Sequence, residues 1–163
     1  MTLLELIKAL SQDIPVGVLV TDSNLEAPGP SIIYANKAMG ELVGRHPADL
    51  LGLNPRFMQG RETRRPTLDA FALALRAGER FHGFLTNYRA DGSKYVAEID
   101  CRPLHDTNGD FTHFVAFERE VVRRRGRPFL GARGRFEPLI TSDNSLTPGL
   151  QALGVFKKAH APT

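Results

Sequence analysis

The sequence lacks most of the features that would place it in a specialised class. Its 163 residues include no tryptophan and one cysteine, Cys101, which excludes an internal disulfide framework and permits a reducing compartment. No apolar run is long enough to span a bilayer, and Glu5 interrupts the apolar N-terminal stretch, which argues against a secretory signal. The net charge is only +3, so charge alone does not indicate a nucleic-acid-binding protein. We therefore expect a cytoplasmic protein with no membrane partner.

Patterns of catalytic residues are missing as well. Ser11, Asp13 and the five histidines form no nucleophile–base pattern, and no glycine-rich loop is suited to phosphate. His105, Asp106 and Asp110 lie together, but in a predicted hairpin turn, where aspartate is favoured for backbone reasons, and without metal-ligand spacing. We therefore expect neither an enzyme nor a metal site.

What is present predicts an α+β chain. The β-branched run 15–21 and the segment 31–35 are typical of short strands, and Asn36 can cap a helix over 37–43 that Gly44 ends. Further helices are predicted over 47–51 and 66–77, the latter burying Leu68, Phe71, Ala72 and Leu75, and long strands over 81–89, 94–104 and 111–122. Two strands, several short helices and three strands make an α+β order.

The N-terminal residues 1–14 are predicted to form a cap helix. Leu3, Leu6, Ile7 and Leu10 follow the spacing of one helical face over 2–10. Such a stripe can pack on its own domain, or it can form a contact in a homodimer. The sequence leaves both possibilities open.

The C-terminal residues 123–163 form a basic, turn-rich and irregular extension. Pro128, Gly131, Gly134 and Pro138 argue against a long helix, whereas Leu150, Leu153, Val155 and Phe156 could close the chain onto the sheet. The Arg-Gly-Arg-Pro segment 125–128 resembles the core of an AT-hook, which lays arginines in the minor groove of A·T-rich DNA. A small regulator that contacts DNA through this tail is therefore one alternative.

The stretch 52–60 carries the most specific signal. Its Gly-Leu-Asn-Pro-Arg-Phe-Met-Gln-Gly resembles the flavin-binding pattern Gly-x-Asn-Cys-Arg-Phe-Leu-Gln-Gly of LOV domains, the blue-light-sensing branch of the PAS family. Here Pro55 stands at the place of the photoactive cysteine. The segments 21–22, 34–36, 87–92 and 108–110 match as well. The resemblance implies a PAS fold over 15–122, in which short helices cover one face of a five-stranded antiparallel sheet.

The resemblance also implies a cofactor site for FMN. Asn54 and Gln59 correspond to contacts with the ribityl chain, Arg56 to the phosphate contact and Asn87 to a contact with the ring edge. Glu118 stands where the family has the glutamine that senses protonation of the flavin. Strand alternation predicts that three sets face the helices together: Gly83, Leu85 and Asn87; Ala97, Ile99 and Cys101; and Phe114, Ala116 and Glu118.

Other departures from the family pattern weaken the expected flavin site. The second phosphate-binding arginine falls on Ala72, and the second asparagine at the ring edge falls on Ala97. Arg61, Arg64 or Arg65 offers a replacement for the lost arginine. A buried polar edge without its partner costs about 1–3 kcal/mol, so the cofactor is expected to be either FMN or none.

We thus expect a LOV-like PAS signalling module without a cysteine-adduct photocycle. Its output would pass through a homodimer or through a partner protein that the sequence does not identify. A flavin-free PAS domain for protein interaction remains the second alternative.

Overall fold

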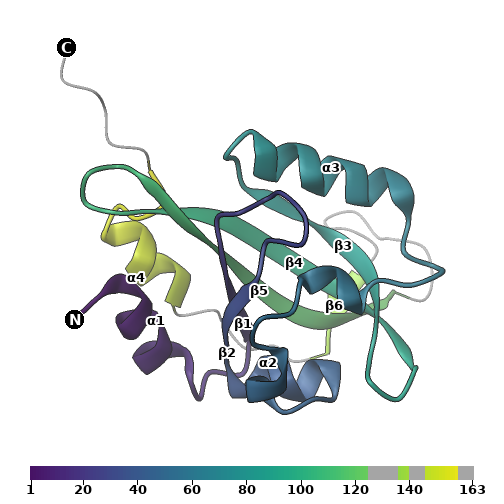
Figure 1. The fold of residues 1–163 in the computed structure, drawn as a ribbon. Helices are drawn as coiled ribbons and strands as arrows, with labels where there is room; N and C mark the ends of the chain where they lie inside the picture. The colour runs from purple at the N-terminus through teal and green to yellow at the C-terminus, as the bar shows by residue number, and fades with distance from the viewer. Residues whose placement is uncertain (125–135, 140–145, 158–163) are drawn as a thin grey trace, which may run out of the picture.

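The computed structural model describes residues 1–124, 136–139 and 146–157. In chain order its elements are α1 (Leu3–Ser11), β1 (Gly17–Asp22), β2 (Ile32–Ala35), α2 (Lys37–Val43), the 3₁₀ helices η1 (Pro47–Leu50) and η2 (Pro55–Met58), α3 (Arg65–Arg76), β3 (Phe81–Tyr88), β4 (Lys94–His105), β5 (Phe111–Arg123), β6 (Phe136–Pro138) and α4 (Leu146–Ala152). The predicted α+β fold class is confirmed (Figure 1). No helix in the described part of the chain has both the length and the apolar character needed to cross a bilayer.

An antiparallel sheet in the order β2-β1-β5-β4-β3 forms the centre of the molecule. The predicted five-stranded sheet is confirmed, and a short sixth strand, β6, adds to it. β6 pairs with residues 121–123 of β5, whereas β1 pairs with residues 113–118. The sequence did not predict β6, because three residues are too few to show the alternating pattern of a strand.

Asn36 joins β2 to α2 and satisfies its buried amide completely. Its Oδ1 accepts from the backbone N–H groups of Val18 and Met39, and its Nδ2 donates to the carbonyls of Ser11 and Val16. The residue is therefore both the predicted helix cap and a tie between α1, β1 and α2. Gly44 then ends α2 with a φ of 73°, a left-handed conformation that favours glycine.

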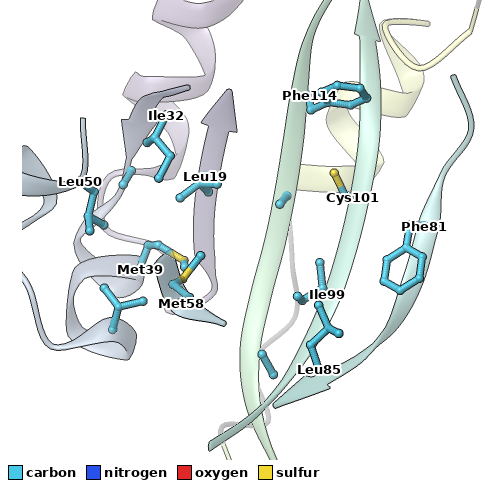
Figure 2. Close-up of a cluster of buried hydrophobic side chains, with 14 of the residues drawn as sticks. Leu19, Ile32, Met39, Leu50, Met58, Phe81, Leu85, Ile99, Cys101 and Phe114 are labelled. Carbon is cyan, nitrogen blue, oxygen red and sulfur yellow. The ribbon is translucent and has the colours of Figure 1, made fainter. Parts of the chain in front are cut away.

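The inner face of the sheet is covered by α2, η1, η2 and α3. Figure 2 shows the core that forms there. Ile99 and Cys101 come from β4, Leu19 comes from β1, and Met39 and Leu50 come from α2 and η1. One expectation needs correction, because α3 buries no residue completely. Leu68, Phe71, Ala72 and Leu75 are only partly buried, since they line the cavity described below.

The outer face is covered in part by the two ends of the chain. Ile7 of α1 and Leu146 and Leu150 of α4 are buried in one cluster with β1, β4 and β5 side chains, and α1 and α4 lie side by side in Figure 1. The predicted apolar stripe of α1 is thus only partly used, because Leu10 remains 54% exposed.

The expected closing segment also differs in detail. Leu146, not Leu153, joins Leu150 in the core, and Leu153 stays exposed. The backbone N–H of His105 donates to the Val155 carbonyl at 2.7 Å, which fixes the segment to the end of β4. The Arg-Gly-Arg-Pro segment 125–128 lies outside the described residues.

Candidate functional site

The η2 turn positions the polar residues of the 52–60 stretch. Asn54 caps this turn, its Oδ1 accepting from the backbone N–H of Arg56 at 2.9 Å, and Pro55 occupies the first helical position, which suits its fixed φ. Gln59 ends the turn, donating its backbone N–H to the Arg56 carbonyl at 3.0 Å. A one-turn helix therefore presents Asn54, Arg56 and Gln59 within six residues.

A cavity of about 680 Å³ lies between η2, α3 and the inner face of the sheet. All five residues predicted for the cofactor site line it: Asn54, Arg56, Gln59, Asn87 and Glu118. Apolar side chains from β1, α3, β3, β4 and β5 make up most of the remaining wall, among them Leu19, Leu68, Phe71, Leu85, Ile99 and Phe114. The fold therefore brings together residues from three separate parts of the chain.

Asn54 has less free hydrogen-bonding capacity than the family pattern suggests. Its Nδ2 donates to the carbonyls of Pro28 and Gly29, at 2.9 and 2.8 Å, and thereby holds the loop between β1 and β2. Because Oδ1 already serves as the helix cap, Asn54 can offer a ligand only the second lone pair of that oxygen. It can accept from a ligand hydroxyl, but its donors are in use.

Arg56 and Gln59 keep their side chains available. Neither side chain makes a hydrogen bond or ion pair with the residues that the structure describes, and Arg56 is exposed while Gln59 is half-buried. These two groups therefore supply free donors at the η2 side of the cavity.

Glu118 lines the cavity from β5, is 2% exposed and lies opposite Ile99 in the sheet. Its Oε2 has no hydrogen-bond partner among the described residues. Burial raises the pKa of Glu118 from an ordinary value of 4.5 to about 7, because removal from water disfavours the charged form. The carboxyl group can thus be neutral near physiological pH and can donate a hydrogen bond into the cavity.

Asn87 of β3 lines the same cavity as Glu118, and Tyr95 of β4 is close enough to Glu118 to interact with it electrostatically. Asn87, 2% exposed, is directly opposite Tyr95 in the β3–β4 ladder. The amide is close enough to affect the pKa of the Tyr95 hydroxyl, yet no hydrogen bond of good geometry joins the two, and that hydroxyl has no partner in the described chain. Burial, reinforced by Glu118, raises the pKa of Tyr95, so the phenol stays protonated.

Cys101 also lines the cavity, on β4 opposite Ala116. It is buried, and that burial, followed by the nearby Glu118, raises the pKa of its thiol strongly. A thiol held protonated is a poor nucleophile. Ala97, four residues earlier on the same face of β4, is fully buried but does not belong to the cavity wall.

The arginines expected to compensate for Ala72 are arranged differently. Arg65 lines the cavity, but its Nε is 3.1 Å from Oδ1 of Asp69, and Arg61 and Arg64 do not belong to the wall. Arg76, which the sequence reasoning did not consider, does line it. Its spacing of four residues from Ala72 on a predicted helix was the signal that could have identified it. Within the described residues, no group of histidine, cysteine or acidic side chains is suited to a metal ion.

An antiparallel sheet with short helices over one face and a partly polar cavity between them defines a small α+β domain. The model of the PAS domain family matches residues 15–123. The chain belongs to the PAS domain family.

Solved structures similar to this chain are LOV domains. The LOV domain of a blue-light-activated histidine kinase from Erythrobacter litoralis is 27% identical with a TM-score of 0.60, covering 66% of this chain and 96% of that one. The LOV domain of the blue-light photoreceptor Aureochrome1 is 30% identical with a TM-score of 0.61, covering 72% and 89%. The domain is thus of the PAS/LOV sensory type.

A curated relative extends the likeness to transcriptional control. The bacterioopsin transcriptional activator of Halobacterium salinarum is 30% identical over 134 residues, which cover 81% of this chain and 20% of that protein. Two further relatives, a rice phototropin-2 and a Brucella anthropi blue-light-activated histidine kinase, are matched over 11% and 23% of their length. The chain therefore spans a minor part of each of these relatives.

Proposed function

We propose that this chain is a LOV-like PAS sensory module that binds FMN without a cysteine adduct and signals through a dimer or a partner protein. The observation that carries the proposal is the convergence of Asn54, Arg56, Gln59, Asn87 and Glu118 on one cavity. Their ligand roles come from the family pattern, and their common wall is what supports applying that pattern to this chain.

The cavity fits a ligand of this size and polarity. Its volume of about 680 Å³ lies within the roughly 300–1,000 Å³ typical of small-molecule sites. The η2 turn offers the free cation Arg56 and the free amide of Gln59, and the sheet offers Asn87 and the unpartnered Oε2 of Glu118. A flavin mononucleotide has a phosphate at one end and a polar ring edge at the other, so these groups complement it.

FMN bound here would supply absorption of blue light. Arg56 would hold the phosphate by a charge-assisted hydrogen bond, and Gln59 and the free lone pair of Asn54 would bind the ribityl chain. Asn87 would bind the ring edge as both donor and acceptor. Protonated Glu118 would donate to a ring carbonyl, whereas ionised Glu118 would oppose it.

Position 55 determines which photochemistry is open to the module. Pro55 has no nucleophilic side chain, and the sole cysteine of the chain, Cys101, carries a thiol whose pKa is raised by burial. No residue of the η2 turn can therefore form a thioether with a bound flavin. The response to light would have to arise from changes in hydrogen bonding at the ring edge.

Strand β5 provides a direct route from the cavity to the outer face. Glu118 points into the cavity, while Val115 and Phe117 of the same strand pack with α1 and α4 on the other face. A change in the hydrogen bonding of Glu118 would thus act on the strand that supports both terminal helices. This arrangement supports an output through a dimer or partner that contacts those helices.

Titration of FMN fluorescence with the purified chain tests the proposal. We expect quenching at saturation with the wild type, and about tenfold weaker binding for Asn87→Leu, because the ring edge loses its buried amide. Asn108→Leu, at an exposed hairpin position, is the matched control and should bind like the wild type. Failure of the wild type to bind FMN would favour the flavin-free alternative instead.

A further inference from the structure

The loop between β1 and β2 forms part of the cavity wall. Leu25 and Pro30 of this loop line the cavity together with residues of α3 and of the inner face of the sheet. Leu25 is half-buried against the inner core, whereas the other residues from 23 to 28 are exposed to solvent. In Figure 1 the loop is the dark segment that joins β1 to β2. On this side, an exposed surface loop separates the cavity from solvent.

The two ends of the loop are fixed to each other by Asp22 and Ser31. The backbone N–H of Asp22 donates to the Ser31 carbonyl at 3.0 Å, and Asp22 Oδ1 accepts from the backbone N–H of Ser31 at 3.1 Å. Nearer the tip, the backbone N–H of Gly29 donates to the Glu26 carbonyl at 2.8 Å. The segment 23–30 is therefore braced within itself and can move as one unit about its base.

The side chain of Asn54 ties this segment to the η2 turn. Its Nδ2 donates to the carbonyls of Pro28 and Gly29 at 2.9 and 2.8 Å. Among the residues that the structure describes, no other hydrogen bond joins segment 23–30 to a part of the chain outside the loop and its base. Because a neutral hydrogen bond contributes little net stability, the two bonds from this amide can break and re-form without unfolding of the domain.

We propose that segment 23–30 is a lid over the cavity and that Asn54 is the latch that holds the lid shut. Opening the lid breaks the two hydrogen bonds from Nδ2 and lets a ligand reach the inner wall. Asn54 is then a positioning residue, because it controls access to the cavity through the loop that it holds. The inference concerns a movement of the chain itself and applies to any ligand of the cavity, so it does not depend on the proposed flavin function.

Asn54→Asp separates the latch from the helix cap. The carboxylate keeps an oxygen that can accept from the backbone N–H of Arg56 and cap η2, but it has no donor for the two loop carbonyls. Cys101, the sole cysteine, is buried in the cavity wall, so the rate at which a thiol reagent modifies the native protein reports access to the cavity. We expect iodoacetamide to modify ligand-free Asn54→Asp about tenfold faster than the wild type.

Hydrogen exchange locates the opening. Backbone amides of residues 23–31 should exchange faster in Asn54→Asp, while those of α2 should exchange as in the wild type. Asn54→Ser is a second variant without added charge, because its hydroxyl can cap η2 but has a single donor and cannot serve both carbonyls. Asn108→Asp makes the same substitution at an exposed hairpin position and should match the wild type in both measurements.

Four results would overturn the proposal. Equal rates for the wild type and both variants at position 54 would show that the latch does not limit access. Faster exchange of the lid without faster modification of Cys101 would show that the loop moves but does not guard the cavity. An effect in Asn54→Asp that is absent from Asn54→Ser would assign it to the added charge. Faster exchange throughout the chain would show that Asn54 supports the whole fold rather than the lid.

Discussion

At the scale of single residues, the protonation of Glu118 makes the stability of the fold depend on pH. A carboxyl group with a pKa of about 7 in the folded protein and 4.5 in its ordinary state binds more protons when folded. Its contribution to stability is therefore fully present below pH 4.5 and is lost as the pH rises toward 7.

We predict that the free energy of unfolding of the wild type falls over this pH range relative to Glu118→Gln. The difference should reach about 3 kcal/mol above neutral pH, because each pKa unit corresponds to about 1.4 kcal/mol. Denaturant unfolding of both proteins at several pH values measures it. Parallel stability curves for the two proteins would show that Glu118 does not titrate in the folded state.

Glu118→Gln should also raise the occupancy of FMN above neutral pH, because an amide can donate to a carbonyl that a carboxylate repels. Adding Ala97→Asn should raise the occupancy further, because Ala97 lies two residues before Ile99 of the cavity wall on the same face of β4 and a longer amide side chain from there can reach toward the ring edge. The ratio of flavin to protein after reconstitution is the measurement, with melting curves to check that the larger side chain is tolerated at the fully buried position 97. No gain in either variant would mean that shape, not polarity, limits binding.

Cys101 should not replace the missing thiol at position 55. We predict that illuminated, flavin-loaded protein shows flavin fluorescence without the reversible bleaching of a thioether adduct, because the buried thiol stays protonated. Absorption spectra before and after blue light measure this. Reversible bleaching that persists in Cys101→Ser would contradict the account, since no other thiol exists in the chain.

At the scale of elements, α1 combines a buried and an exposed apolar residue. Ile7 is fully buried, whereas Leu10 is 54% exposed and available to a second copy. We predict that Ile7→Ala costs about 2–4 kcal/mol in unfolding free energy. Leu10→Glu should leave the unfolding free energy nearly unchanged. If the wild type is a homodimer, the variant should be more monomeric than the wild type at the same concentration. Sedimentation at micromolar concentration measures the association, and a monomeric wild type would show that α1 is only a cap.

The sequence was most informative where a residue acts through its local backbone. Helix α2 begins after Asn36 and ends at Gly44, as predicted. Gly92 and Gly109, with φ of 86° and 80°, lie in the two predicted hairpin turns. Strand alternation likewise placed Asn87 and Glu118 on one face, because the side-chain period of a strand is fixed.

Features that depend on packing between distant segments could not be predicted in this way. The donors of Asn54 are used by the loop at residues 28–29, which no local pattern shows. The partial exposure of the apolar face of α3 reflects the cavity beneath it, and β6 is too short to stand out. Arg76 was missed because the family pattern directed attention to Ala72 rather than to the next turn.

At the scale of the whole molecule, the two faces of one sheet are covered by different parts of the chain. Its inner face, η2 and α3 line the cavity. Part of its outer face carries α1 and α4 (Figure 1). β5 lies between β1 and β4 and contributes side chains to both faces, so under the proposed function a ligand at Glu118 would act on the strand that supports the terminal helices. The inner face would then be the ligand side of the PAS domain and the outer face its output side.

Retention of flavin by the purified chain tests this account most directly. The protein is incubated with excess FMN below pH 7, where Glu118 is protonated, and is then separated from free flavin by gel filtration. We predict a yellow protein that retains about one FMN per chain and shows structured absorbance in the blue. A colourless protein from both the wild type and Glu118→Gln would contradict the central claim that the cavity is a flavin site.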